Sequence, residues 1–145
     1  MDGRVHFSSQ TDDWATPQDF FDRLDAIFEF TLDPCADAKN AKCVRFFTPE
    51  DDGLTQNWDG ERVFMNPPYG RRIGAWVKKA SEAKALVVCL LPARTDTRWW
   101  HDYVVEGDGH IIFLKGRLSF GEGENAAPFP SAVVIFYGDA IRNKP

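Results

Sequence analysis

Apolar residues recur along the chain in two different periods, and these periods predict an alternating series of helices and strands. The clearest helical segment is TPQDFFDRLDAIF at residues 16–28. Its apolar positions lie at helical spacing: Phe20, Phe21, Leu24, Ile27 and Phe28. Thr16 is expected as the N-cap, Pro17 as the first helical residue and Asp19 near the positive end of the helix dipole.

Short apolar runs predict strands: FTL at 30–32, VRFF at 44–47, RVFM at 62–65, LVVCLL at 86–91, HIIFL at 110–114 and SAVVIFY at 131–137. Helical spacing returns over residues 73–85, and again over 95–104 with Thr95 or Asp96 as the expected cap. Strands that alternate with helices favour right-handed crossovers and therefore a parallel sheet covered by helices. The last two strands have no helix between them and are expected to pair antiparallel. The sequence thus predicts an α/β fold with a mostly parallel sheet.

A chain of 145 residues that is 43% hydrophobic can bury one core, so we expect one compact domain over residues 1–145, with residues 1–13 disordered. No apolar run reaches the roughly 20 residues that span a bilayer, and the first residues lack the apolar stretch of a secretion signal. A cytoplasmic protein is expected. Cys35, Cys43 and Cys89 form no CxxC pair, and the three histidines have no metal-ligand spacing, so free thiols and no metal are predicted.

Charge is distributed unevenly along the chain. The net charge of −5 argues mildly against a nucleic-acid partner, because phosphate binding needs a positive surface. Residues 1–65 carry 6 Lys/Arg against 14 Asp/Glu, whereas residues 66–120 carry 9 against 5. A basic middle segment therefore begins at residue 66, which indicates either a phosphate-facing surface or a chance asymmetry of solvated residues.

Two polar loops follow predicted strands, and both are expected at the same edge of the sheet. Asp33-Pro34 follows the run FTL, and the tetrapeptide Asn66-Pro67-Pro68-Tyr69 follows RVFM. Ligands of open α/β sheets bind outside the carboxyl ends of the strands. A strand end and a simple turn would also explain each loop taken alone, but their order on an alternating pattern favours a ligand site.

The tetrapeptide suits the activation of a planar amine. Its prolines lack N–H groups and stiffen the backbone, so the carbonyls of Asn66 and Pro67 are held in place. The Asn66 oxygen and a neighbouring carbonyl can accept both hydrogens of an exocyclic amino group, while the Tyr69 ring offers a face for stacking. Two such acceptors favour a pyramidal nitrogen with a localised lone pair, as in the transition state of attack on an electrophile.

Asp33 supplies a carboxylate that can hold an ammonium group or a ribose hydroxyl of a cofactor. S-adenosylmethionine has both groups, together with a sulfonium that makes its methyl electrophilic. Methyl transfer to an amine is therefore the chemistry that the two loops predict together.

Five blocks of the sequence resemble the phage-type DNA N-6-adenine methyltransferases, the small phage Dam-like family. They are WATP at 14–17, LDPCA at 32–36, NPPYG at 66–70, LLPARTDTRWWH at 90–101 and KGRLSF at 115–120. The resemblance implies a Rossmann-like fold that binds S-adenosylmethionine and methylates adenine N6 in double-stranded DNA. It implies a protein encoded by a phage or prophage that acts in the bacterial cytoplasm. Both a monomer and a homodimer stay open.

The resemblance also assigns residues to roles. The catalytic loop is matched by Asn66, Pro67, Pro68 and Tyr69, and the cofactor site by Trp14, Thr16, Pro17, Asp33, Pro34 and Asp52. We expect phosphate or base contacts from Arg71, Arg72, Arg94, Arg98, Trp99, Lys115 and Arg117. Trp76 lies at core spacing and is expected to pack in the interior, and of the neighbouring Trp99 and Trp100 one is expected to be exposed.

The chain departs from larger amino methyltransferases in two ways. The loop DPCADAKN at 33–40 has no glycine, and there is no room for a separate target-recognition domain. Sequence discrimination must then come from short loops or be weak. Methylation of cytosine N4, an RNA amine or a protein glutamine, and an inactive nucleic-acid-binding module, stay open as alternatives.

Overall fold

A computed structural model describes residues 14–120 and 126–138 of the chain. Residues 1–13, for which the sequence predicts disorder, lie outside the described residues. Within the described parts, no helix is long and apolar enough to cross a membrane.

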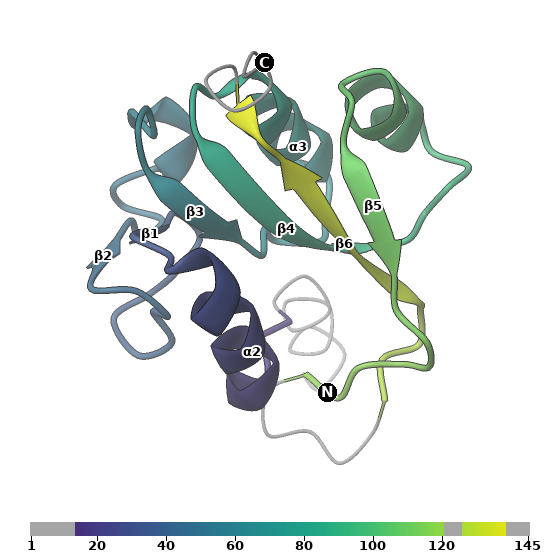
Figure 1. Ribbon diagram of the computed structural model, residues 1–145, viewed down its shortest axis with the longest axis horizontal. Coiled ribbons are helices and arrows are strands. Elements are labelled where there is room, and N and C mark those ends of the chain that lie inside the picture. The colour runs from purple at the N-terminus through teal and green to yellow at the C-terminus, as the bar shows by residue number, and fades with distance from the viewer. Residues whose placement is uncertain (1–13, 121–125, 139–145) are drawn as a thin grey trace, which may run out of the picture.

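One six-stranded sheet forms the centre of the fold (Figure 1). Its strands are β1 (Leu32–Asp33), β2 (Arg45–Phe46), β3 (Arg62–Met65), β4 (Leu86–Pro92), β5 (His110–Phe113) and β6 (Ser131–Phe136). Their spatial order is β2-β1-β3-β4-β6-β5. The first four strands in this order are parallel, and β6 is antiparallel to both of its neighbours. The predicted mostly parallel sheet and the predicted antiparallel pairing of the last two strands are both confirmed.

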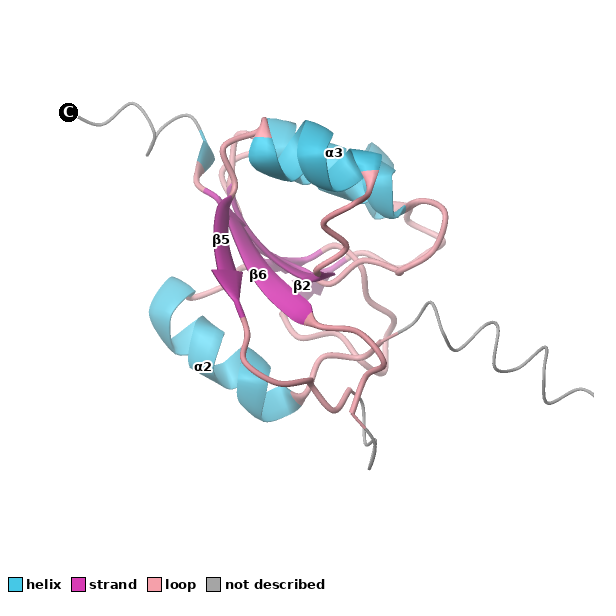
Figure 2. Cartoon of the chain, turned by 90° about the vertical axis from the view of Figure 1, so that its right-hand side faces the viewer, coloured by secondary structure: helices cyan, strands magenta, loops and turns pink. Residues whose placement is uncertain are grey.

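Helices cover both faces of the sheet (Figure 2). Helix α2 (Gln18–Phe28) lies on one face, and α3 (Ile73–Glu82) lies on the other. A π-helical turn, η2 (Trp100–Val105), packs beside α3, and a single 3-10 turn, η1 (Gly53–Thr55), follows β2. Strand β4 is buried from Val87 to Pro92, as its continuous apolar run predicts for a strand covered on both faces.

The predicted cap of the first helix is wrong. Pro17 occupies the N-cap position, because its carbonyl accepts the first helical hydrogen bond from Phe21 N at 3.1 Å. The Thr16 hydroxyl makes no cap and instead accepts a hydrogen bond from Asn66. A tertiary partner has thus displaced the local interaction that the sequence favours.

The cap predicted for the third helical segment, over residues 95–104, is also wrong. The Thr97 hydroxyl, rather than Thr95 or Asp96, accepts a hydrogen bond from Trp100 N at 3.3 Å. Trp100 is buried, and Trp99 is half-buried against Gly74 rather than exposed. Neither tryptophan is fully exposed, because α3 approaches Trp99 closely at Gly74.

The topology brings the two polar loops together. Since β1 and β3 are neighbouring parallel strands, their carboxyl ends meet at one edge of the sheet, where Asp33 and Asn66 lie. This edge is where ligands of open α/β sheets bind.

Candidate active site

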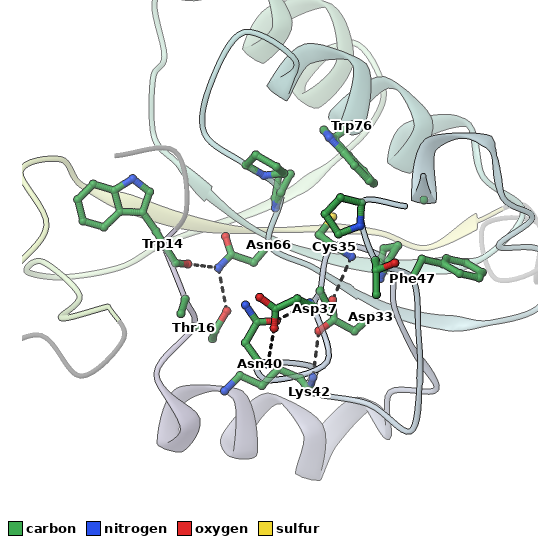
Figure 3. A pocket seen from close by; sticks show the side chains of 18 of the residues that line it. Trp14, Thr16, Asp33, Cys35, Asp37, Asn40, Lys42, Phe47, Asn66 and Trp76 are labelled. Carbon is green, nitrogen blue, oxygen red and sulfur yellow. Dashed lines mark hydrogen bonds between the residues drawn. The ribbon is translucent and has the colours of Figure 1, made fainter. Parts of the chain in front are cut away.

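A pocket of about 570 Å³ opens at the carboxyl edge of the sheet (Figure 3). Its walls come from residues 14–16, 33–37, 47–49, 52–53, 66–68 and 70–72, with Asn40, Lys42, Phe64 and Trp76. The volume lies within the range of roughly 300–1,000 Å³ that small-molecule and cofactor sites occupy. The predicted catalytic loop and the predicted cofactor loop therefore share one cavity.

Asn66 presents an unpaired acceptor. Its Nδ2 donates to the main-chain carbonyl of Trp14 and to Thr16 Oγ1, the latter at 2.9 Å, and Figure 3 shows the nitrogen turned toward these residues. A carbonyl can only accept, so the nitrogen of the carboxamide must face Trp14. Asn66 Oδ1 is left buried without a hydrogen-bond partner. Because a buried unpaired acceptor is costly, this atom is poised for a donor from a ligand.

The rest of the tetrapeptide is divided between the pocket and the core. Pro67 and Pro68 line the pocket. Tyr69 does not, because its side chain is buried beneath the loop and its hydroxyl donates to the carbonyl of Leu90 at 2.9 Å. Burial raises the pKa of the Tyr69 phenol well above its ordinary value, so the phenol stays protonated at neutral pH.

Tyr69 belongs to a group of packed rings that we call the aromatic cluster: Trp14, Tyr69, Phe120 and Phe129. The Trp14 ring contacts Phe120 and Phe129 edge-on, with ring centroids 5.6 Å and 5.2 Å away. The Tyr69 ring contacts the same two phenylalanines at 6.3 Å and 5.6 Å. Protein side chains surround the Tyr69 ring in this arrangement. Stacking of the ring on a base stays a prediction.

Asp33 is a buried carboxylate at the end of β1. Its side chain accepts hydrogen bonds from the main-chain N–H of Cys35 at 3.2 Å and of Lys42 at 3.0 Å. Burial raises the pKa of Asp33 above its ordinary value, and the two backbone hydrogen bonds offset part of the rise. Each carboxylate oxygen keeps a second lone pair, so the group can still accept a donor from the pocket.

The glycine-free loop after β1 is shaped by side chains instead. Asp37 Oδ1 accepts from the main-chain N–H of Lys39 at 2.8 Å and of Asn40 at 2.9 Å, and Asn40 Oδ1 accepts from Asp37 N at 2.8 Å. Such bonds mimic a backbone turn, which removes the need for glycine. Asp37, Asn40 and Lys42 line the pocket, although sequence reasoning missed them. The polar pattern of residues 37–40 was the available signal.

Asp52 and Gly53 line the pocket at the start of η1. Asp52 lines the pocket in a left-handed conformation with φ 56°, and its side chain accepts from Leu54 N at 3.3 Å. Gly53 packs so closely that a Cβ built on it would lie 2.3 Å from the Pro34 carbonyl oxygen. Trp76 is buried, as predicted, stacks with Trp58 and also lines the pocket. Sequence reasoning assigned it to the core alone.

The predicted cofactor residues Trp14, Thr16, Asp33, Pro34 and Asp52 all line the pocket, whereas Pro17 does not. The Trp14 carbonyl and the Thr16 hydroxyl also accept hydrogen bonds from Asn66.

The predicted DNA contacts are spread over the surface. Arg71 and Arg72 are exposed and line the pocket mouth. Exposed Arg94 places its guanidinium 5.8 Å from the centroid of the Phe129 ring, beside the aromatic cluster. Exposed Arg98, Lys115 and Arg117 do not line the pocket, and Arg117 donates to the Ala127 carbonyl at 3.4 Å.

The sequence assigns the three cysteines no role in the site, although Cys35 lines the pocket. Cys35, Cys43 and Cys89 are free, as predicted, and burial raises the pKa of all three, that of Cys43 to about 12. Among residues 14–120 and 126–138, no group of three or more His, Cys, Asp or Glu side chains could hold a metal ion.

The fold and the site define this chain as an α/β protein with a pocket at the carboxyl edge of a mostly parallel sheet, beside the unpaired Asn66 Oδ1. The chain belongs to the DNA N-6-adenine-methyltransferase (Dam) family, whose model matches residues 5–136. The resemblance found in the sequence is thereby confirmed.

Named relatives agree with this family. A DNA N-6-adenine-methyltransferase of Haemophilus phage HP1 is 32% identical over 139 residues, which cover 88% of this chain and 80% of that protein. A DNA N-6-adenine-methyltransferase of Escherichia phage T1 is 29% identical over 148 residues, covering 86% of this chain and 62% of that protein. A shorter match of 66 residues, 39% identical, joins 40% of this chain to 71% of a putative methyltransferase, YfdM, of Escherichia coli.

Proposed function

We propose that this protein transfers a methyl group from S-adenosylmethionine to N6 of an adenine in DNA, on a Rossmann-like methyltransferase fold. The observation that carries the proposal is the buried, unpartnered Oδ1 of Asn66 beside a cofactor-sized pocket. Membership of the Dam family supports adenine N6 as the acceptor.

The chain's own groups prepare the amine for attack. Asn66 Oδ1 and the Pro67 carbonyl accept the two N6 hydrogens, which favours a pyramidal nitrogen and frees its lone pair from the ring. Bound S-adenosylmethionine supplies an electrophilic methyl on a sulfonium. These acceptors hold the amino group as positive charge develops on its nitrogen, so they stabilise the transition state more than the planar ground state.

The residues present fit the cofactor. Asp33 is 5% exposed, and its ionisation inside the fold is costly unless a cation approaches. We propose that the ammonium group or a ribose hydroxyl of the cofactor lies against this carboxylate, while Phe47 and Trp76 give the pocket apolar walls. Asp37, Asn40 and Asp52 add polar groups for the rest of the molecule.

The raised pKa of Asp33 predicts a pH dependence of cofactor affinity. Because burial disfavours the charged form, the folded protein loses stability as pH rises through the pKa of Asp33, and a bound cation offsets this loss. Affinity for S-adenosylmethionine is therefore expected to fall as the pH is lowered toward that pKa, which lies above 3.8. Calorimetric titration at a series of acid pH values measures this affinity. Asp33→Asn should bind more weakly at neutral pH and lose most of the pH dependence; an unchanged profile in that variant would place the titrating group elsewhere.

Double-stranded DNA is the proposed partner, and the target adenine must leave the helix because a stacked N6 cannot reach a recessed pocket. Arg71 and Arg72 are the basic residues at the pocket mouth. Replacing both with Ala is expected to weaken DNA binding uniformly across sequences and to lower the salt slope of binding by about 1 per lost phosphate contact.

Fluorescence anisotropy at several salt concentrations measures this slope. Arg23→Ala is the matched control, because Arg23 is exposed on α2 and lies 3.8 Å from Asp19, away from the pocket. Equal slopes for the double variant and the control would remove Arg71 and Arg72 from the DNA interface.

The proposed reaction is tested by incubating the purified protein with unmethylated duplex DNA and labelled S-adenosylmethionine, followed by nucleoside digestion and mass spectrometry. N6-methyladenine is the expected product, and mapping it gives the recognition sequence. Label in N4-methylcytosine, or in RNA or a protein glutamine when these substrates are offered in competition with the DNA, would transfer the same site chemistry to another acceptor. Absence of saturable cofactor binding would instead favour a nucleic-acid-binding module. Since the named phage relatives set the context, we propose that the protein acts in the cytoplasm of a bacterial host.

A further inference from the structure

We infer that Thr16 is a positioning residue: together with the main-chain carbonyl of Trp14, it fixes the orientation in which the Asn66 carboxamide meets the acceptor amine. The inference rests on the proposed function, since it concerns the same catalytic asparagine. It assigns to Thr16 a role directed at the amine, beyond the contact with the cofactor that the resemblance implies.

Asn66 uses both of its amide hydrogens on the segment that precedes α2. One goes to the Trp14 carbonyl and the other to Thr16 Oγ1 at 2.9 Å. A carbonyl accepts but cannot donate, so the Trp14 bond excludes the flipped carboxamide. The Thr16 bond stops rotation about the last side-chain torsion, which is otherwise broad. Together they leave Oδ1 buried, unpaired and held in one direction.

Thr16 is itself firmly held. Its side chain is 6% exposed, and the residue directly precedes Pro17, whose carbonyl starts the hydrogen-bond ladder of α2. The sequence predicts Thr16 as the N-cap of this helix, a role that threonine often takes. Here α2 has no side-chain cap, and the hydroxyl serves Asn66 instead. The helix thereby sets the position of the acceptor that orients the asparagine.

Trp14 is fixed by the packing of its ring. Its ring packs edge-on against Phe120 and Phe129 in the aromatic cluster, which holds the backbone of residue 14 beside Asn66. The carboxamide is thus held by two acceptors on the segment before α2, and the residue that carries one of them, Trp14, is anchored in the aromatic cluster. Positioning of this kind matters because small displacements of a catalytic group reduce the rate sharply.

The test compares Thr16→Val, which keeps the shape but lacks an acceptor, with Thr16→Ser, which keeps the hydroxyl. Thr16→Val is expected to lower kcat of DNA methylation by on the order of 10-fold, the worth of one hydrogen bond at the upper end of its usual range. Its KM and its calorimetric Kd for S-adenosylmethionine should stay close to those of the original protein. Thr16→Ser is expected to restore most of kcat.

A double-mutant cycle separates positioning from a general structural role. In an Asn66→Ala background, Thr16→Val should cause no further loss, because the side chain that it orients is gone. Additive losses in this cycle, equal losses for Val and Ser, or a main effect on cofactor Kd would each overturn the inference. If Thr16→Val lowers the melting temperature strongly, Thr16→Ala is measured in the same cycle, since it lacks the acceptor without adding bulk.

Asn66→Asp tests the same two hydrogen bonds independently. A carboxylate in this place would put a negative oxygen against the Trp14 carbonyl, so this variant is expected to lose as much activity as Asn66→Ala. Substantial activity of Asn66→Asp would contradict the claim that these two hydrogen bonds orient the side chain for the reaction. Formation of N6-methyladenine by the unchanged protein is measured first, so a failure of the proposed reaction is recognised separately from a failure of this inference.

Discussion

Replacing Asn66 with Ala is expected to reduce methyl transfer by at least on the order of 10²-fold while S-adenosylmethionine still binds, as when a main transition-state hydrogen bond is removed. The expectation follows from the direction of the side chain. Both amide hydrogens are used by Trp14 and Thr16, so only Oδ1 is available to a substrate. Single-turnover kinetics on duplex DNA measures the chemical step, and calorimetry measures the cofactor affinity.

Asn57→Ala is a matched control for this variant. Asn57 is exposed, lies outside the pocket and accepts a local hydrogen bond from Asp59 N at 2.8 Å. Its replacement should leave both rate and cofactor affinity unchanged. If Asn66→Ala kept near-normal turnover, the role assigned to its carboxamide would be wrong, even if the protein proved to be a DNA adenine methyltransferase.

Replacing Gly53 with Ala is expected to weaken the binding of S-adenosylmethionine by at least on the order of 10-fold and to destabilise the fold by about 1–3 kcal/mol, as overpacking does. A Cβ on Gly53 would lie 2.3 Å from the Pro34 carbonyl oxygen and 3.0 Å from the Trp76 ring. The first contact is with backbone, so the loop after β1 must move. Pro34 and Trp76 both line the pocket, and the displacement reaches the cofactor directly.

Gly60→Ala separates lost stability from lost binding. Gly60 has φ 77°, so Ala is strained there by roughly 1–2 kcal/mol, but the space around its Cβ is empty and the residue lies outside the pocket. Thermal unfolding should show a loss for both glycine variants, whereas calorimetry should show weaker cofactor binding only for Gly53→Ala. Equal cofactor affinity in the two variants would mean that the close contact with Pro34 does not shape the binding site.

The Asn66 and Gly53 variants separate the two requirements of the proposed reaction, which are activation of the amine and binding of the cofactor. The first removes an acceptor for the amine and leaves the walls of the pocket in place. The second disturbs the walls and leaves the acceptor. If each variant lost both methyl transfer and cofactor binding, the two halves would form one cooperative site rather than two adjoining ones.

The sequence by itself determined the architecture and the location of the site. Apolar runs identified β4 as a buried strand and β6 as a strand, and helical spacing identified α2 and α3, because the period of apolar residues follows directly from which face an element buries. The order of Asp33 and Asn66 after two such strands then placed both at one sheet edge, since parallel neighbours end on the same side.

Tertiary structure alone decided how the side chains at that edge are used. Thr16 was predicted to cap a helix, yet its hydroxyl accepts a hydrogen bond from Asn66. The Tyr69 hydroxyl donates to the Leu90 carbonyl inside the core, a partner that no local pattern indicates. Gly53 is expected to tolerate no side chain because the Pro34 carbonyl packs against it. These contacts join segments distant in the chain, and their formation depends on distances of a few tenths of an ångström. Local periodicity carries no such information, because it records which side of an element is buried and not which atom meets it there.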